Sequence, residues 1–78
     1  MKIQTTSPER LAIPASEVAK LLSVSERHVW TLHATGRLPR PIRLGRSVRW
    51  DYAELLAWMK AGAPPRARWE QMRRRNGQ

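Results

Sequence analysis

Apolar residues recur every three to four positions between residues 15 and 34, which predicts two consecutive helices. Four apolar residues form one face of the first helix: Val18, Ala19, Leu21 and Leu22. In the second helix Val29 and Leu32 face inward and polar side chains face outward. Residues 23–25 form the turn, and Ser25 can cap the second helix because its hydroxyl can accept a backbone N–H.

The pattern changes after Gly36, which is expected to end the second helix in a left-handed conformation. Residues 38–41 include two prolines and are therefore expected to be extended. Apolar and polar residues then alternate over residues 42–50 on both sides of Gly45, which predicts a β-hairpin.

The hairpin has two registers to choose between. A two-residue loop at 45–46 would put Arg49 on the same face as Ile42 and Leu44. A three-residue loop at 45–47 gathers the apolar residues on one face and the arginines Arg43 and Arg49 on the other, so the burial pattern favours it. In that register the apolar cross-strand pairs are Leu44 with Val48 and Ile42 with Trp50.

A third helix is expected over residues 52–60, capped by Asp51 and ended by Gly62. Its inward residues are predicted to be Leu55, Leu56 and Met59. The fold class is therefore mainly α with a small β-hairpin: a winged helix-turn-helix of three helices and a two-stranded wing. The predicted organisation is a flexible arm over residues 1–11, the domain over 12–62, and a basic tail over 63–78 that forms a short helix or is disordered.

The distribution of charge points to a binding partner. The chain carries a formal net charge of +9, from 15 Lys and Arg against 6 Asp and Glu. Five arginines recur at three-residue steps with no acidic residue among them: Arg37, Arg40, Arg43, Arg46 and Arg49. A basic face of this kind is typical of proteins that bind nucleic acid. The alternative is that the arginines keep an edge hairpin soluble.

In a helix-turn-helix, the start of the second helix approaches base edges in the major groove. The candidate base-reading residues are Ser25, Glu26, Arg27, His28 and Thr31, with Glu26 a candidate acceptor from cytosine. The alternative is an ordinary solvated helix face. The candidate wing residues are Arg43, Arg46, Ser47 and Arg49, with Arg46 at the tip aimed at a minor groove and Arg37 and Arg40 as auxiliary cations.

The four tryptophans need separate interpretations. Trp50 and Trp58 are expected in the core, and Trp30 is expected to bridge the second helix and the wing. Trp69 has no evident core to join, so it is interpreted as an exposed anchor for a partner protein, with disorder as the alternative. The possible partner-binding tail comprises Trp69, Met72, Arg73, Arg74 and Arg75. His33 is expected to contact the backbone or the wing.

Several function classes are disfavoured by composition and spacing. The chain has no cysteine, and His28 and His33 lie five positions apart without a third ligand, so neither a metal nor another cofactor is expected. Carboxylates are scattered and no catalytic constellation is present, so the protein is not expected to be an enzyme. Neither a signal peptide nor a membrane span is expected, and the protein is expected to be soluble and cytoplasmic.

Three segments resemble a known family of small DNA-binding proteins. Residues 16–30 look like the opening of excisionase-like and AlpA-type proteins, and residues 51–59 are similar to their closing helix. The segment between them resembles the hairpin of these proteins and reads Gly36-Arg37-Leu38-Pro39-Arg40-Pro41-Ile42-Arg43-Leu44-Gly45-Arg46-Ser47-Val48-Arg49-Trp50.

The resemblance implies a winged helix-turn-helix related to the MerR-type DNA-binding domain, encoded by a bacterial prophage, phage or integrative element. Such a protein would associate with the nucleoid, bind duplex DNA and assemble along it. As an excisionase, or recombination directionality factor, it would bend attachment-site DNA and steer an integrase. The alternatives are an AlpA-like transcriptional regulator of element genes, or a DNA-bound adaptor whose basic tail docks a partner protein.

Overall fold

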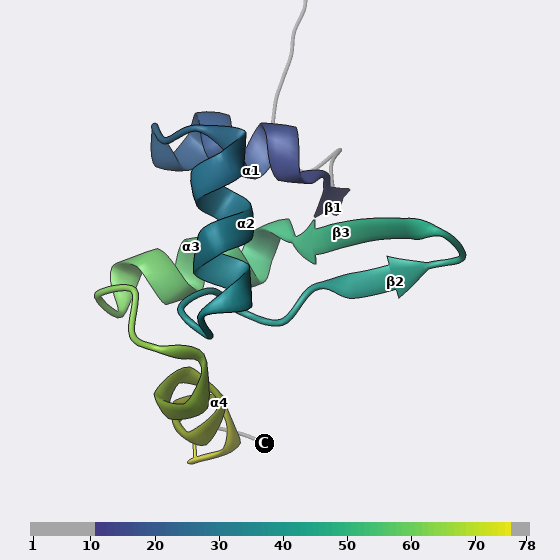
Figure 1. The fold of residues 1–78 in the computed structure, drawn as a ribbon. Helices are drawn as coiled ribbons and strands as arrows, with labels where there is room; N and C mark the ends of the chain where they lie inside the picture. The colour runs from purple at the N-terminus through teal and green to yellow at the C-terminus, as the bar shows by residue number, and fades with distance from the viewer. Residues whose placement is uncertain (1–10, 76–78) are drawn as a thin grey trace, which may run out of the picture.

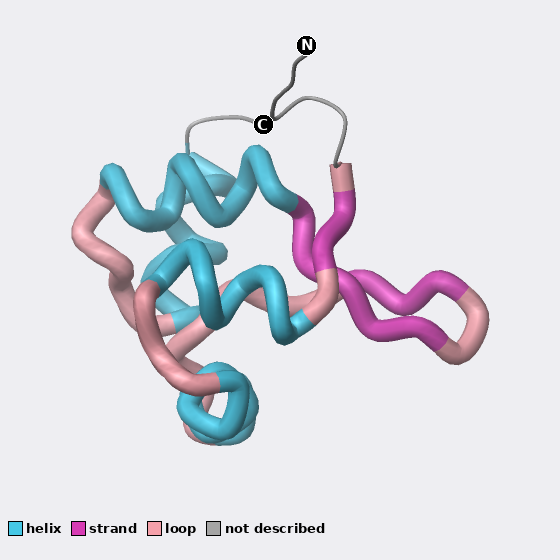
Figure 2. Tube along the Cα trace, turned by 90° about the horizontal axis from the view of Figure 1, so that it is seen from above, coloured by secondary structure: helices cyan, strands magenta, loops and turns pink. Residues whose placement is uncertain are grey.

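The computed structural model describes residues 11–75, which form a mainly helical domain with a small antiparallel sheet (Figure 1). The elements in order are β1 (Ala12–Ile13), α1 (Ala15–Leu22), α2 (Glu26–Ala34), β2 (Ile42–Leu44), β3 (Ser47–Asp51), α3 (Tyr52–Lys60) and α4 (Arg66–Arg75). The strand order is β1-β3-β2, and the hairpin of β2 and β3 projects from the helices (Figure 2). The winged helix-turn-helix prediction is confirmed, with β1 and α4 as elements beyond the three helices and two strands expected.

The helix ends form where local side-chain chemistry predicts them. The Ser25 hydroxyl accepts a hydrogen bond from the His28 amide at 3.0 Å, and Asp51 Oδ1 accepts one from the Glu54 amide at 3.2 Å. Gly36 has φ 71°, and the amides of residues 36 and 37 return to the carbonyls of His33 and Leu32 at 3.2 Å and 2.8 Å. This pair of bonds is the Schellman arrangement, which satisfies carbonyls that the helix end would leave unpaired.

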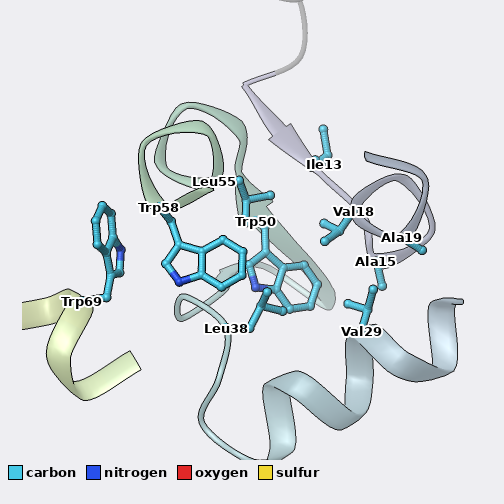
Figure 3. Packing of buried hydrophobic residues seen from close by; sticks show 10 residues of the cluster. All are labelled: Ile13, Ala15, Val18, Ala19, Val29, Leu38, Trp50, Leu55, Trp58 and Trp69. Atoms are coloured by element: carbon cyan, nitrogen blue, oxygen red, sulfur yellow. The ribbon is translucent and has the colours of Figure 1, made fainter. Parts of the chain in front are cut away.

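The core lies between α1, α2, α3 and β3, and tryptophans dominate it (Figure 3). Trp50 and Trp58 are buried, as predicted, and their indole N–H groups donate to the carbonyls of Pro39 at 2.9 Å and Pro64 at 2.8 Å. Since a buried indole N–H without an acceptor is costly, these two bonds fix the course of both proline-containing loops.

The inward faces of two helices are narrower than the sequence pattern indicates. In α1, Val18 and Ala19 are buried, whereas Leu21 is exposed. In α3 the buried residues are Leu55 and Trp58, and the expected inward residues Leu56 and Met59 are half exposed. The buried stripe of α3 is therefore centred on Leu55 and Trp58, two positions three apart on one helix face.

The hairpin register differs from the prediction. Ile42 pairs with Arg49, Arg43 with Val48 and Leu44 with Ser47, so the loop has two residues rather than three. A type II′ hairpin turn has positive φ at its first central residue only. Gly45 has φ 63° and Arg46 is not in the left-handed region, which fits this turn. All of β2 is exposed. Because this strand lies beyond the core, turn geometry sets the register and burial does not.

The interpretation of Trp69 as an exposed anchor is also wrong. Residues 66–75, for which a short helix and disorder were both open, form α4, and Trp69 is only 6% exposed. Its indole N–H donates to Glu54 Oε2 at 2.8 Å, and Met72 is partly buried against the same core. Residues 63–78 contain few apolar residues, but α3 supplies a packing surface for Trp69 and the Glu54 carboxylate that accepts its N–H.

Burial of Trp69 predicts a large loss of stability when its ring is removed. Trp69→Ala should lower the free energy of unfolding by about 3–5 kcal/mol, the usual cost of truncating a buried aromatic residue. Urea denaturation followed by far-UV circular dichroism measures this change. Arg68→Ala is the matched control, because Arg68 lies exposed on the same helix. Equal midpoints for Trp69→Ala and the wild type would contradict the burial of Trp69.

Candidate nucleic-acid interface

The predicted base-reading residues lie together on the outward face of α2. Glu26, Arg27, His28 and Thr31 are exposed, whereas Val29 between them is fully buried. Val29 faces the core, so Arg27 and Thr31 project from the opposite side of the helix, and Glu26 and His28 lie exposed on either side of them. Ser25 lies at the start of this face, but its oxygen is already an acceptor for the helix cap.

Aromatic contacts fix the other end of α2 against the base of the hairpin. The Trp30 and His33 rings meet the buried Trp50 ring edge-on, with centroid distances of 5.5 Å and 6.0 Å. Trp30 and His33 also contact each other at 5.9 Å. Trp30 thus joins the second helix to a wing strand, as the sequence analysis expected, and His33 does so as well.

The three hairpin arginines do not share a face. Arg43 pairs with Val48, and side chains alternate along β3, so Arg43 lies on the same face as Trp50, the face that meets α2. Arg49 lies on the opposite face, half-buried, and its Nη1 donates to the Val48 carbonyl at 3.0 Å. The expectation that Arg43 and Arg49 form one basic face is therefore wrong.

The loop places the remaining wing candidates at the hairpin tip. Arg46 is exposed at the tip, as predicted, although the loop has two residues and not the three expected. Ser47 is half-buried and faces Leu44 across the strands. The structure therefore turns Arg43 toward the α2 side, holds Arg46 at the tip and leaves Arg49 on the far side.

The auxiliary arginines have different surroundings. Arg37 follows the end of α2 and is exposed. Arg40 Nε donates to Glu70 Oε2 on α4 at 3.1 Å, and this hydrogen bond holds the pKa of the Glu70 carboxyl below its usual value. In the predicted partner-binding segment, Arg73 pairs with Glu54 at 2.7 Å and Arg74 is exposed, while the Arg75 side chain lies outside the described part of the chain.

Positive charge is left unneutralised on the α2 and hairpin side. Within residues 11–75 the ion pairs are Arg40–Glu70 and Arg73–Glu54, and both involve α4. Arg27, Arg43 and Arg46 belong to neither pair. Free guanidinium groups next to an exposed helix face form a surface suited to a polyanion.

Sequence reasoning missed Arg66, the first residue of α4. Its Nε donates to the Leu38 carbonyl at 2.8 Å, and its Nη2 lies 3.0 Å from the His33 carbonyl and 3.1 Å from His33 Nδ1. A guanidinium has no acceptor, so Nδ1 is the acceptor in this contact, which favours the neutral form of the imidazole. No sequence pattern links Arg66 to Leu38 or His33, because both lie far earlier in the chain.

Within residues 11–75, no group of three potential ligands among His, Asp and Glu is placed to hold a metal ion. In that same range, no helix combines the length and apolar character needed to span a membrane.

A family model described as a helix-turn-helix domain matches residues 15–63, which is more than half of the chain. The chain therefore belongs to this family, and the match, taken with the fold, makes it a DNA-binding helix-turn-helix protein. The matched segment runs from α1 through α3 and stops before α4. Searches of curated proteins and of solved structures gave no significant match.

The contacts of His33 predict a pH-dependent stability. Burial lowers the pKa of the His33 imidazole, and the neighbouring Arg66 and Arg43 lower it further. As the pH decreases, the unfolded chain therefore takes up this proton at a higher pH than the folded chain does. The free energy of unfolding decreases as the pH is lowered through the range between the two pKa values. Between about pH 7.5 and pH 5.5, the urea midpoint should fall more for the wild type than for His33→Gln. Equal falls in the two proteins would show that His33 is not the group responsible.

Proposed function

We propose that this protein is a sequence-specific duplex DNA-binding protein of a phage or integrative element, and that it acts as an excisionase. In this role it binds and bends attachment-site DNA, assembles along it and steers an integrase toward excision. The observation that supports the proposal most is the exposed polar face of α2 beside hairpin arginines that have no ion-pair partner within residues 11–75. The excisionase role itself rests on the resemblance of residues 36–50 to excisionase hairpins.

The proposed reading element is the first two turns of α2, placed in the major groove. Arg27 would donate two hydrogen bonds to the O6 and N7 atoms of guanine, and Glu26 would accept from the N4 amino group of cytosine. His28 and Thr31 lie exposed on the same helix and would contact adjacent bases. The buried Val29 sets the angle at which these side chains enter the groove.

The proposed backbone element is the hairpin. Arg43 lies on the face that meets α2, and Arg46 lies at the tip of the narrow two-residue loop. With α2 in the major groove, these two cations would contact phosphates beside the adjacent minor groove, whose potential is most negative over narrow A·T tracts. Engaging both grooves at once would favour bent DNA.

The sequence preference should be measured by selecting bound duplexes from a random pool and comparing Kd for the selected and random duplexes. We expect a defined motif, bound roughly a thousandfold more tightly than random DNA. Clustered repeats of the motif at an attachment site, bound cooperatively, would support the excisionase role. A single motif at a promoter would instead indicate an AlpA-like transcriptional regulator. Recovery of no motif would contradict sequence-specific binding.

Arg27→Ala should weaken binding to the selected duplex by about 1–3 kcal/mol, because a two-pronged base contact is lost. Binding to random DNA should change little, since that binding depends on phosphates. Competition binding at fixed salt measures both quantities, and Arg68→Ala removes the same charge elsewhere as a control. Equal losses on both duplexes would assign Arg27 to the DNA backbone.

The hairpin register makes a separate prediction about salt dependence. Arg43→Ala and Arg46→Ala should each lower the slope of log Kd against log salt concentration by about one, because each removes a phosphate contact. Arg49→Ala should leave the slope unchanged, since Arg49 lies on the far face of the same hairpin. A slope that falls as much for Arg49→Ala as for Arg43→Ala would contradict the assignment of faces.

A further inference from the structure

We propose that Arg66 is a positioning residue that fixes the recognition helix α2 relative to the hairpin, and that α4 thereby contributes to sequence specificity. The inference rests on the proposed function, in which α2 reads base edges. Helix α4 lies beyond the residues that match the helix-turn-helix family. The contribution would therefore come from outside the shared domain.

One arginine joins three successive parts of the chain. The guanidinium donates to the carbonyl of His33 in the last turn of α2, at 3.0 Å. It also donates to the carbonyl of Leu38, at 2.8 Å, in the linker between α2 and β2 (residues 35–41). The backbone amide of Arg66 donates to the Gly36 carbonyl at 2.9 Å. Arg66 therefore bonds to the helix end, its terminating glycine and the segment that leads into the hairpin.

The placement of Arg66 is not explained by the stability of α4 itself. The first turn of α4 contains no acidic residue, and Arg66 and Arg68 both lie there. Positive charge is unfavourable at a helix N-terminus and favourable at a helix C-terminus. Arg66 is thus poorly placed for its own helix and well placed for the C-terminal end of α2.

The other contacts of α4 fix the position from which Arg66 acts. Trp69 is buried, and its indole N–H and Arg73 Nη1 both donate to Glu54 Oε2 in the first turn of α3, at 2.8 Å and 2.7 Å. Glu70 pairs with Arg40 in the linker. Helix α4 therefore extends from the end of α2 to α3, beneath both of them in the view of Figure 1.

Loss of these bonds should affect specific binding more than general attraction to DNA. Hydrogen bonds to base edges weaken steeply when their distance or angle changes, whereas attraction to phosphates extends over about 8–10 Å. Thr31 lies two residues before His33, so movement of the last turn reaches the reading face directly. Loss of the bond to the Leu38 carbonyl would at the same time remove one restraint on the segment that leads into the hairpin.

The test uses Arg66→Ala and Arg66→Lys in the full chain, with Arg68→Ala as the control. Lysine keeps the charge but cannot reproduce the planar fork that reaches two carbonyls. The ratio of Kd for random and selected duplexes should fall roughly tenfold for both Arg66 variants, comparable to the loss of one base contact. The ratio for Arg68→Ala should stay at the wild-type value, since Arg68 is exposed.

A purely structural role gives a different result. Partial unfolding reduces the binding-competent fraction and weakens binding to both duplexes by the same factor, so the ratio is unchanged. An unchanged ratio in Arg66→Ala, or a wild-type ratio in Arg66→Lys, would overturn the proposal.

A second measurement does not depend on DNA and separates failure of this inference from failure of the proposed function. Amide hydrogen exchange should accelerate in Arg66→Ala at residues 35–37, whose amides close the end of α2, relative to the amide of Val29. Arg68→Ala should show no such change. Uniform acceleration, or none at residues 35–37, would overturn the positioning role even for a wild-type protein that showed no sequence preference.

Discussion

The fully buried indole of Trp50 is the point at which the recognition helix, the linker and the hairpin meet. Its ring packs against Trp30 and His33 of α2, and its N–H donates to the Pro39 carbonyl. Its backbone lies in β3 and pairs with Ile13 of β1. The Trp50 side chain thus holds α2 against the base of the hairpin, and the spacing between the two proposed DNA-contacting elements depends on it.

Local chemistry was sufficient to predict most of the helix-turn-helix. Ser25, Asp51 and Gly36 each act through atoms within a few residues of themselves, so their roles as caps and terminators are legible in the sequence. Trp50 and Trp58 were predicted in the core for their apolar area alone. The exposure of the candidate residues on α2 also follows from local pattern, because one helix with a buried Val29 leaves the polar positions outside.

The hairpin and the tail depend on information that periodicity does not contain. The prediction assumed that Ile42 and Leu44 are buried, but both project from a strand outside the core, and Gly45 sets the loop instead. Trp69 and Arg66 acquire their roles only through partners far away in the chain, namely Glu54 and His33. Contacts of that kind become visible only when the helices are placed in three dimensions.

The central claim is that α2 and the α2-facing side of the hairpin form one DNA-binding surface, with α4 as a support. The most direct test is an NMR titration of the labelled protein with a selected duplex, following every assigned backbone amide. We expect the largest shifts at residues 25–31 and 43–47 and small shifts along α3. Shifts concentrated at exposed residues of α4 such as Arg68 and Arg74, with α2 unperturbed, would contradict the account.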